Sequence, residues 1–482
     1  MKKNSIVKNY IYNLIYQIIV LILPLITTPY ISRVLGAENI GIYSYTISIA
    51  TYFVLFGSLG IALYGQREIA YNQNNRKKYS VIFWEIIVLR TITMLISITI
   101  FYFTFVNGKQ YQMYYRILLL EIIGNCLDIS WFFQGLEEFK KTVTRNMIVK
   151  FISVISIFIF IKEPKDLYLY FWIYVLSTLI GNGSLWLYLP KYLEKVTLKE
   201  MNILRHLKPT LSLFIPQIAI QVYTLLDRTM VGTIVENKSE VGYYDQGQKI
   251  VKMLLAVITS MGTVMLPRIA NTFVNNEKEK VTQYMKKSFN MVFLLSIPMI
   301  FGIVVVSKSF VPVFFGKGYE KVAILMSVIS PIILLIGLSN VTGTQYLLPT
   351  KRQKEYTISV VCGAIVNFIM NCILIKNMGA VGASIGTVIA ETTVTCVQLY
   401  FVRNDFNLLK IVKLSKNYLI SGIIMCICCY LVNLLKLSSI KDVILKVFVG
   451  GIVYIMALLV LKDEFLNEII NKILKKIKGE VK

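Results

Sequence analysis

The sequence predicts an all-α polytopic membrane protein of 14 transmembrane helices: two pseudo-symmetric six-helix bundles around a central cavity, plus two extra C-terminal helices. Three observations predict this fold: long apolar stretches recur from Asn9 to Leu461, the loops between them alternate in basic charge, and motifs of the first half return in the second. A helix needs about 20 mostly apolar residues to cross the hydrocarbon core of a bilayer. We therefore expect spans at residues 9–32, 41–66, 81–106, 112–133, 142–161, 166–190, 209–231, 245–267, 287–306, 321–345, 356–375, 379–402, 417–435 and 440–461.

The loops between these spans predict the orientation. Every second loop, together with both chain ends, carries roughly three times as many Lys and Arg residues as the other loops, and such residues are retained in the cytoplasm. We therefore expect both termini in the cytoplasm and a multi-pass protein of the cell membrane. The same bias accounts for the net charge of +25, so this charge does not indicate nucleic-acid binding. The basic loops should instead attract anionic membrane lipids.

The inventory of reactive side chains argues against metal and disulfide chemistry. All seven Cys fall within predicted spans, and the only histidine, His206, falls in a basic loop where we expect it to be solvated. No cofactor is expected. The loops are too short to fold into a catalytic domain, so any function must lie in the membrane part or at its mouths. We interpret Trp84, Trp131 and Trp186 as anchors at the cytoplasmic interface.

An internal repeat predicts the two bundles. Ser32-Arg33-Val34-Leu35-Gly36 is followed by Gly41-Ile42-Tyr43, and Asp227-Arg228-Thr229-Met230-Val231-Gly232 is followed by Gly242-Tyr243-Tyr244. Six predicted spans separate the copies, and an even number leaves both in the same orientation, which is typical of transporters built from parallel repeats. We expect an N-terminal bundle at residues 1–195, a C-terminal bundle at 196–405, and two additional helices with a basic tail at 406–482.

Ionisable residues inside the predicted spans divide into two groups. An ionisable side chain at the centre of a span costs about 2.5–3.5 kcal/mol, so each needs a partner or a wet cavity. In the N-terminal bundle we expect an internal salt-bridge network among the ionisable residues of the spans, in which Arg90 and Lys150 neutralise Glu121 and Asp128, although a functional role stays open. Its members are Glu85, Arg90, Arg116, Glu121, Asp128 and Lys150.

The second group predicts a cationic cavity. Basic side chains stand near both ends of the expected central cavity, and a cluster of cations in a low-dielectric cleft attracts anions, phosphate above all for arginine. The predicted binding residues are Arg33, Arg67, Arg228, Lys249, Lys252 and Arg268. As an alternative, the arginines at span ends are boundary residues that reach to the interface. Asp128, Asp227 and Glu391 are candidates for ion coupling or for ion pairs.

Several motifs, in order and spacing over roughly residues 5–400, resemble those of the bacterial polysaccharide repeat-unit flippases, which serve O-antigen, capsule and exopolysaccharide synthesis. These flippases belong to the superfamily of multidrug, oligosaccharidyl-lipid and polysaccharide exporters. The motifs are Ile31-Ser32-Arg33-Val34-Leu35-Gly36 with Gly41-Ile42-Tyr43, Tyr64-Gly65-Gln66-Arg67-Glu68-Ile69-Ala70, Phe133-Gln134-Gly135-Leu136-Glu137, Leu226-Asp227-Arg228-Thr229-Met230-Val231-Gly232 with Val241-Gly242-Tyr243-Tyr244, Leu266-Pro267-Arg268-Ile269, and Gly379-Ala380-Val381-Gly382-Ala383-Ser384 with Glu391.

The resemblance implies a transporter rather than an enzyme. Its implied substrate is an undecaprenyl-pyrophosphate-linked oligosaccharide, turned from the cytoplasmic to the outer leaflet, and a separate polymerase is an implied partner. The positions of the matching motifs imply that the predicted basic residues line the cavity. Lys252 is the exception, because it is predicted from its helical spacing to Lys249 and not from a motif. Three alternatives stay open: a multidrug or cation antiporter of the same superfamily, a lipid II flippase, and a membrane-embedded polymerase or glycosyltransferase.

Overall fold

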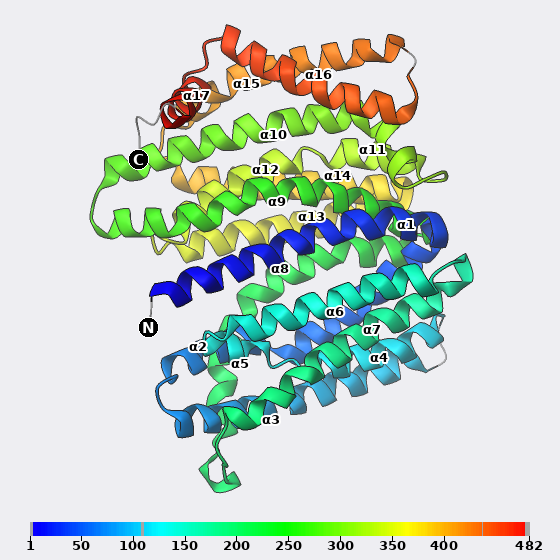
Figure 1. The fold of residues 1–482 in the computed structure, drawn as a ribbon, viewed down its shortest axis with the longest axis vertical. Coiled ribbons are helices and arrows are strands. Elements are labelled where there is room, and N and C mark those ends of the chain that lie inside the picture. The colour runs from blue at the N-terminus through cyan, green and yellow to red at the C-terminus, as the bar shows by residue number, and fades with distance from the viewer. Residues whose placement is uncertain (1–2, 108–109, 436, 478–482) are drawn as a thin grey trace. The chain divides into compact units, whose positions relative to one another are not determined.

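The computed structural model describes residues 3–107, 110–435 and 437–477, and in this part of the chain all regular structure is helical. Figure 1 shows the helices in chain order from blue to red. The chain divides into two compact units: unit 1 comprises Met1–Gly232 and Glu236–Gly242, and unit 2 comprises Thr233–Val235 and Tyr243–Lys482. Eleven of the described helical stretches are long and apolar enough to cross a membrane, which makes this a multi-pass membrane protein.

Unit 1 is built from the first eight helices. They are α1 (Lys3–Ser58), α2 (Ile61–Tyr71), α3 (Arg76–Phe101), α4 (Gln112–Cys126), α5 (Ser130–Gly135), α6 (Phe139–Phe160), α7 (Leu167–Ser184) and α8 (Leu207–Ile234). Helix α1 packs against α3, α4 and α6, while α4 and α6 both pack against α7. The connection from α7 to α8 runs through three short 3₁₀ segments, Leu185–Lys191, Leu198–Glu200 and Ile203–His206.

Unit 2 contains the remaining helices. They are α9 (Ser239–Val274), α10 (Lys278–Phe314), α11 (Glu320–Ile329), α12 (Ile332–Ser339), α13 (Gln353–Met378), α14 (Ala380–Val402), α15 (Leu408–Leu431), α16 (Ser439–Val460) and α17 (Glu464–Ile477). The pair α13 and α14 forms the most extensive helix contact, and the pair α15 and α16 packs against α10 (Figure 1). A π-helical segment, Asn340–Leu347, continues α12.

Four predicted spans are divided differently in the structure. Helix α1 runs through the span predicted at 9–32 and most of the one predicted at 41–66, with a single non-helical residue, Gly36, at φ 77° and ψ 168°. The span predicted at 41–66 is then broken between α1 and α2. The span predicted at 112–133 is broken between α4 and α5, and the one predicted at 321–345 is broken between α11 and α12. Apolar length predicts how much chain crosses the membrane, but it does not predict where the backbone breaks.

An aromatic core at one end of unit 1 corrects one prediction. Trp131 is fully buried rather than placed at the interface, and its ring stacks on Phe83 with centroids 5.7 Å apart. Trp84 and Trp186 are partly buried against the same core. Because Gly65 has no side chain, α2 approaches the Trp131 ring closely.

Candidate functional site

The predicted cations of unit 1 lie on three helices. Arg33 is exposed on α1, just before the break at Gly36. Arg67 on α2 is partly exposed; its guanidinium lies 5.5 Å from the centroid of the Tyr64 ring and pairs with Glu68 at 3.4 Å. Arg228 on α8 is partly buried and follows Asp227, which is 2% exposed. Arg67 therefore presents a charge held against an aromatic face, a geometry that leaves guanidinium donors available.

The predicted cations of unit 2 share one helix. Lys249 and Lys252 lie about one turn apart on α9 and are partly buried, as the helical spacing predicts. Arg268 is exposed on the same helix, and a rise of about 1.5 Å per residue places it about 24 Å farther along the axis than Lys252. Glu391, 8% exposed, belongs to α14. The two sets of cations thus lie on helices of different units, and all of them except Arg228 belong to stretches long and apolar enough to cross a membrane.

The structure gives Arg90 a different partner from the predicted carboxylates. Its guanidinium donates to the backbone carbonyl oxygens of Asn125 at 2.7 Å and Asp128 at 2.8 Å. Helix α4 ends at Cys126, and the last carbonyls of a helix lack intrahelical donors. The Asp128 carboxylate instead accepts from the backbone N–H of Ser130 at 2.9 Å. Arg90 therefore stabilises a break in the chain rather than a buried acid.

The other half of the predicted network is also rearranged. The carboxylate of Glu121, 4% exposed, accepts a hydrogen bond from the Tyr174 hydroxyl at 2.6 Å. Among the described residues, Lys150 forms neither a hydrogen bond nor an ion pair. The predicted salt-bridge network among these four charged residues is therefore wrong for the described part of the chain.

A polar cavity inside unit 1 was not predicted. It has a volume of about 360 Å³ and lies between α1, α6 and α7. Its polar lining comes from Thr27, Tyr43, Arg145, Asn146, Lys150, Ser153, Tyr170, Tyr174, Ser177, Thr178 and Asn182. Arg145 donates to the Asn182 side-chain oxygen at 3.0 Å. In the sequence, nothing indicates that Arg145, Ser153 and Ser177 line a cavity, except that they are polar residues within otherwise apolar spans.

His206 is buried, which corrects the prediction of a solvated side chain. It is 3% exposed; its Nε2 lies 2.8 Å from a carboxylate oxygen of Glu85, and its Nδ1 lies 2.7 Å from the Tyr64 hydroxyl. Glu85 also accepts from the backbone N–H of Asn202 and pairs with Arg205. This cluster ties the start of α8 to α2 and α3.

The connection between α7 and α8, which leads to this cluster, is also held by solvent-exposed hydrogen bonds and an ion pair. Arg76 donates to the carbonyl oxygens of Lys191 and Tyr192, each at 2.9 Å. Lys77 pairs with Glu200 at 2.7 Å, and this hydrogen bond holds the pKa of the Glu200 carboxyl below its usual value. The connection between α7 and α8 is therefore fixed to the start of α3.

The two copies of the repeated motif meet at their glycines. A Cβ atom added at Gly242 would strike the carbonyl oxygen of Ala37 and lie 3.2 Å from the backbone nitrogen of Gly41. One added at Gly41 would strike the carbonyl oxygen of Lys238. Only residues without a side chain allow the two backbones to approach this closely.

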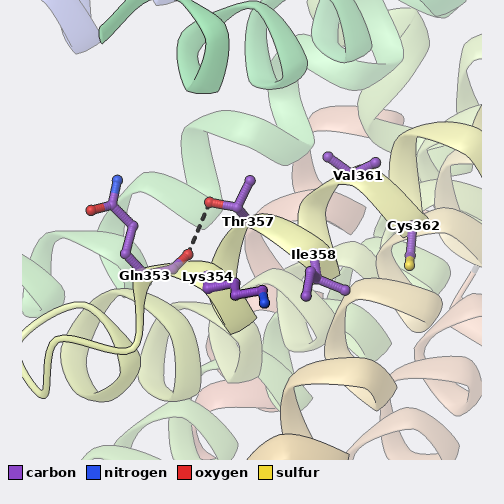
Figure 2. Close-up of a pocket in the computed structure, with 6 residues that line it drawn as sticks. All are labelled: Gln353, Lys354, Thr357, Ile358, Val361 and Cys362. Carbon is purple, nitrogen blue, oxygen red and sulfur yellow. Dashed lines mark hydrogen bonds between the residues drawn. The ribbon is translucent and has the colours of Figure 1, made fainter. Parts of the chain in front are cut away.

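A second cavity, of about 510 Å³, is a groove along a single helix. Figure 2 shows its six lining residues on α13, from Gln353 and Lys354 at the polar end to Val361 and Cys362. The Thr357 hydroxyl donates to the carbonyl oxygen of Gln353 at 2.9 Å. Among the described residues the lining comes from α13 alone, so the groove is a stretch of helix surface.

No cluster of His, Cys, Asp and Glu able to hold a metal ion occurs among the described residues, and all seven Cys there are free thiols. Within that part of the chain, the candidate functional groups are the predicted cations, the buried acids and the lining of the unit 1 cavity.

Comparisons with known proteins place the chain in a family. A model described as "Polysaccharide biosynthesis protein" matches residues 6–273, and a model described as MatE matches residues 213–373. The chain is 28% identical over 410 residues to a putative O-antigen transporter of Escherichia coli (strain K12), an alignment that covers 84% of this chain and 98% of that protein.

Two solved structures share the fold. A lipid II flippase MurJ, in an inward closed conformation, superposes with a TM-score of 0.72 and 16% identity, over 96% of this chain and 100% of that one. An inward-facing multidrug resistance MATE family transporter of the MOP superfamily gives a TM-score of 0.64 and 12% identity, over 82% and 96%. These proteins are transporters and flippases, not enzymes. The family model covers more than half of the sequence, so the chain belongs to the polysaccharide biosynthesis protein family, within the superfamily of MATE-type transporters and flippases.

Proposed function

We propose that the protein flips an undecaprenyl-pyrophosphate-linked oligosaccharide repeat unit from the cytoplasmic to the outer leaflet of the cell membrane. One observation carries the proposal: helices of both units bear cations, in a chain that aligns over 84% of its length with a putative O-antigen transporter. A pyrophosphate is the charged part of such a lipid, and arginine and lysine are the side chains that bind phosphate in proteins.

The proposed topology has 14 crossings with both termini in the cytoplasm. It comprises two related six-helix bundles, at residues 1–195 and 196–405, and two additional helices with a basic tail at 406–482. The repeated Gly-x-Tyr motifs and the close approach of Gly41 and Gly242 support a pseudo-symmetric arrangement. In this topology the central cavity lies between the bundles.

The proposed transport cycle is alternating access through a cationic cavity. The pyrophosphate first binds near Arg67 and Arg268. As the bundles open outward it is held by Lys249 and Lys252, together with Arg33 and Arg228. Several sites of moderate strength suit a transporter better than a single strong site, because the substrate must also leave. Asp128, Asp227 and Glu391 remain candidates for ion coupling, with the Asp128 contact to Ser130 favouring a structural role for that residue.

A multidrug or cation antiporter is the second candidate, favoured by the MatE match at residues 213–373. An organic cation would need a carboxylate-rich cavity. The acids of the C-terminal bundle are mainly Asp227, Asp245 and Glu391, and the six cations proposed for the cavity outnumber them. This balance of charge favours an anionic substrate.

Complementation tests the proposal directly. The gene is expressed in a strain that lacks its own repeat-unit flippase and makes a defined lipid-linked repeat unit, and the lipid-linked sugar is detected separately in each leaflet. We expect outer-leaflet sugar to appear with this protein. Accumulation confined to the cytoplasmic leaflet, at normal protein abundance, would contradict the proposal for that repeat unit, and export of cationic dyes by the same cells would favour the antiporter.

A further inference from the structure

Lys150 occupies an unusual place in the polar cavity of unit 1. It lies at the middle of α6, about 17 Å from the first residue of that helix at a rise of about 1.5 Å per residue. It lines the cavity, is only partly exposed, and forms no hydrogen bond or ion pair with the described residues. A charge at this depth needs an anion or water around it.

The face of α6 that carries Lys150 is turned away from the apolar surface of the helix. Ile148, Ile152, Ile155 and Ile159 are each more than half exposed and recur at helical spacing, as residues that contact lipid do. At about 100° per residue, Lys150 lies on the opposite side of the helix from these isoleucines. Its ammonium group is therefore directed at the cavity and not at the lipid-facing surface.

A second cation in the cavity is positioned by a buried chain of hydrogen bonds. The Asn182 side-chain nitrogen donates to the carbonyl oxygen of Gly124 at 2.8 Å, which turns its oxygen toward Arg145 at 3.0 Å. Asn182 is 7% exposed, so this orientation is fixed by packing as well. Arg145 lies five residues before Lys150 on α6, and both side chains line the same cavity.

The rest of the lining suits an oxyanion. Among the described residues the lining contains no carboxylate. The hydroxyl groups of Thr27, Ser153 and Ser177 donate to backbone carbonyl oxygens of their own helices, so the main donors left for a ligand are the two cations. The hydroxyl oxygens of Ser153 on α6 and Ser177 on α7 lie 2.6 Å apart. The nearby acid, Glu121, is not part of the lining and accepts the hydroxyl hydrogen of Tyr174.

From these observations we propose that the unit 1 cavity is a second anion site, in which Lys150 and Arg145 bind the phosphate groups of the lipid-linked substrate. The identity of this ligand rests on the proposed function; the preference for a phosphate-bearing group rests on the cavity alone. At about 360 Å³ the cavity accommodates a diphosphate with its first attached groups, and not a whole repeat unit. The sugar chain would then lie outside the cavity.

Binding by the purified full-length protein in detergent tests this site. Undecaprenyl pyrophosphate, phosphatidylglycerol and inorganic pyrophosphate are titrated separately, and bound ligand is measured by native mass spectrometry and by thermal stabilisation. Lys150→Met should weaken binding of undecaprenyl pyrophosphate about tenfold or more, since it removes a charge-assisted contact. Lys150→Arg should retain most of the affinity. The Met variant should fold normally, because Lys150 has no hydrogen bond or ion pair with the described residues to lose.

Lys140→Met is the matched control, because Lys140 is an exposed residue at the start of the same helix and the charge change is identical. Equal affinity of the Lys150→Met and Lys140→Met proteins would overturn the proposal. Binding of phosphatidylglycerol alone, with the same dependence on Lys150, would overturn the assignment to the substrate lipid and make this a site for a membrane phospholipid.

The test is separable from that of the proposed function. Loss of undecaprenyl pyrophosphate binding in Lys150→Met together with normal export in Lys249 variants would support the unit 1 site and contradict the central cationic cavity. Normal binding in Lys150→Met together with failed export in Lys249 variants would contradict the unit 1 site and support the central cationic cavity.

Discussion

Buried polar residues of this protein are satisfied largely by backbone groups and neutral side chains, and only some by opposite charges. Arg90 binds two carbonyl oxygens at the end of α4, and Glu121 binds a tyrosine hydroxyl. Glu85 is an exception, because it pairs with Arg205 and contacts His206. Backbone carbonyls at helix ends are as much in need of partners as carboxylates are.

The Glu85 cluster should contribute strongly to stability. Glu85→Gln removes the carboxylate that Arg205 and the buried His206 contact. Because the Arg205 side chain is 46% exposed, the expected cost is that of lost hydrogen bonds to a charged group, about 1.5–3 kcal/mol. We expect a clear fall in the thermal unfolding midpoint of the purified protein. Glu194→Gln is the control: its pair with Arg76 is exposed and long at 3.9 Å, so the change should cost no more than about 1 kcal/mol. Equal midpoints for the two variants would show that the cluster does not stabilise the fold.

The contacts of Arg90 predict how its variants behave. Arg90→Met removes the donors to Asn125 and Asp128 carbonyls and should lower protein abundance. Adding Asp128→Leu should not restore it, because the lost contacts are to the backbone and the second change removes the Ser130 contact as well. Immunoblotting of membranes checks both variants. Restored abundance in the double variant would mean that the carboxylate of Asp128 is the true partner.

At this scale the sequence predicted which charges lie in the membrane but not what they contact. Hydropathy places Lys150 and Arg90 within spans. The partner of Arg90 depends on where α4 ends, and the amino-acid composition does not predict that position. His206 is a similar case. A single histidine in a basic loop is expected to be solvated. It is buried because that loop folds onto α2 and α3.

At the scale of the helices, the break inside α1 lies where the backbone has special freedom. The one non-helical residue within α1 is Gly36, although Pro24 and Pro29 lie in the same helix. Its positive φ is accessible to glycine without strain. The π-helical segment Asn340–Leu347 lies within the stretch predicted as a single span, and such segments often occur at functional sites in membrane helices.

The contact between Gly41 and Gly242 should tolerate no side chain. A methyl group at Gly242 meets the Ala37 carbonyl oxygen, a backbone atom that cannot rotate away, so we expect Gly242→Ala to destabilise the protein by about 1–3 kcal/mol. Gly302→Ala on α10 is the control, because nothing lies within 4 Å of the added atom. Thermal unfolding of both variants checks this. An unchanged midpoint for Gly242→Ala would mean that the two backbones do not pack this closely.

For the whole molecule, the fold class was the most predictable property. An all-helical multi-pass protein follows from apolar length alone, and the comparisons confirm the family that the motifs resemble. The polar cavity of unit 1 could not be predicted, because it depends on which faces of α1, α6 and α7 meet. Helical periodicity gives the face of each helix but not its neighbour across the bundle.

The topology makes a direct prediction about sidedness. In a variant without native cysteines, Asn74→Cys and Asn275→Cys should resist an impermeant thiol reagent in intact cells, whereas Asn237→Cys should react, since basic loops stay in the cytoplasm. All three positions are exposed, so burial does not protect any of them. Labelling at Asn275 with none at Asn237 would invert the proposed orientation.

Export by Lys249 variants tests the central claim most directly. In the complemented flippase-deficient strain, with protein abundance matched by immunoblotting, outer-leaflet sugar should fall sharply for Lys249→Ala and partly for Lys249→Arg, which keeps the charge but changes the geometry. Lys249→Glu should export least, because it repels a phosphate. Lys280→Glu, at an exposed lysine of α10, should export normally. If Lys249→Glu exports as well as the parent protein at equal abundance, an anion-binding cavity at this residue is ruled out.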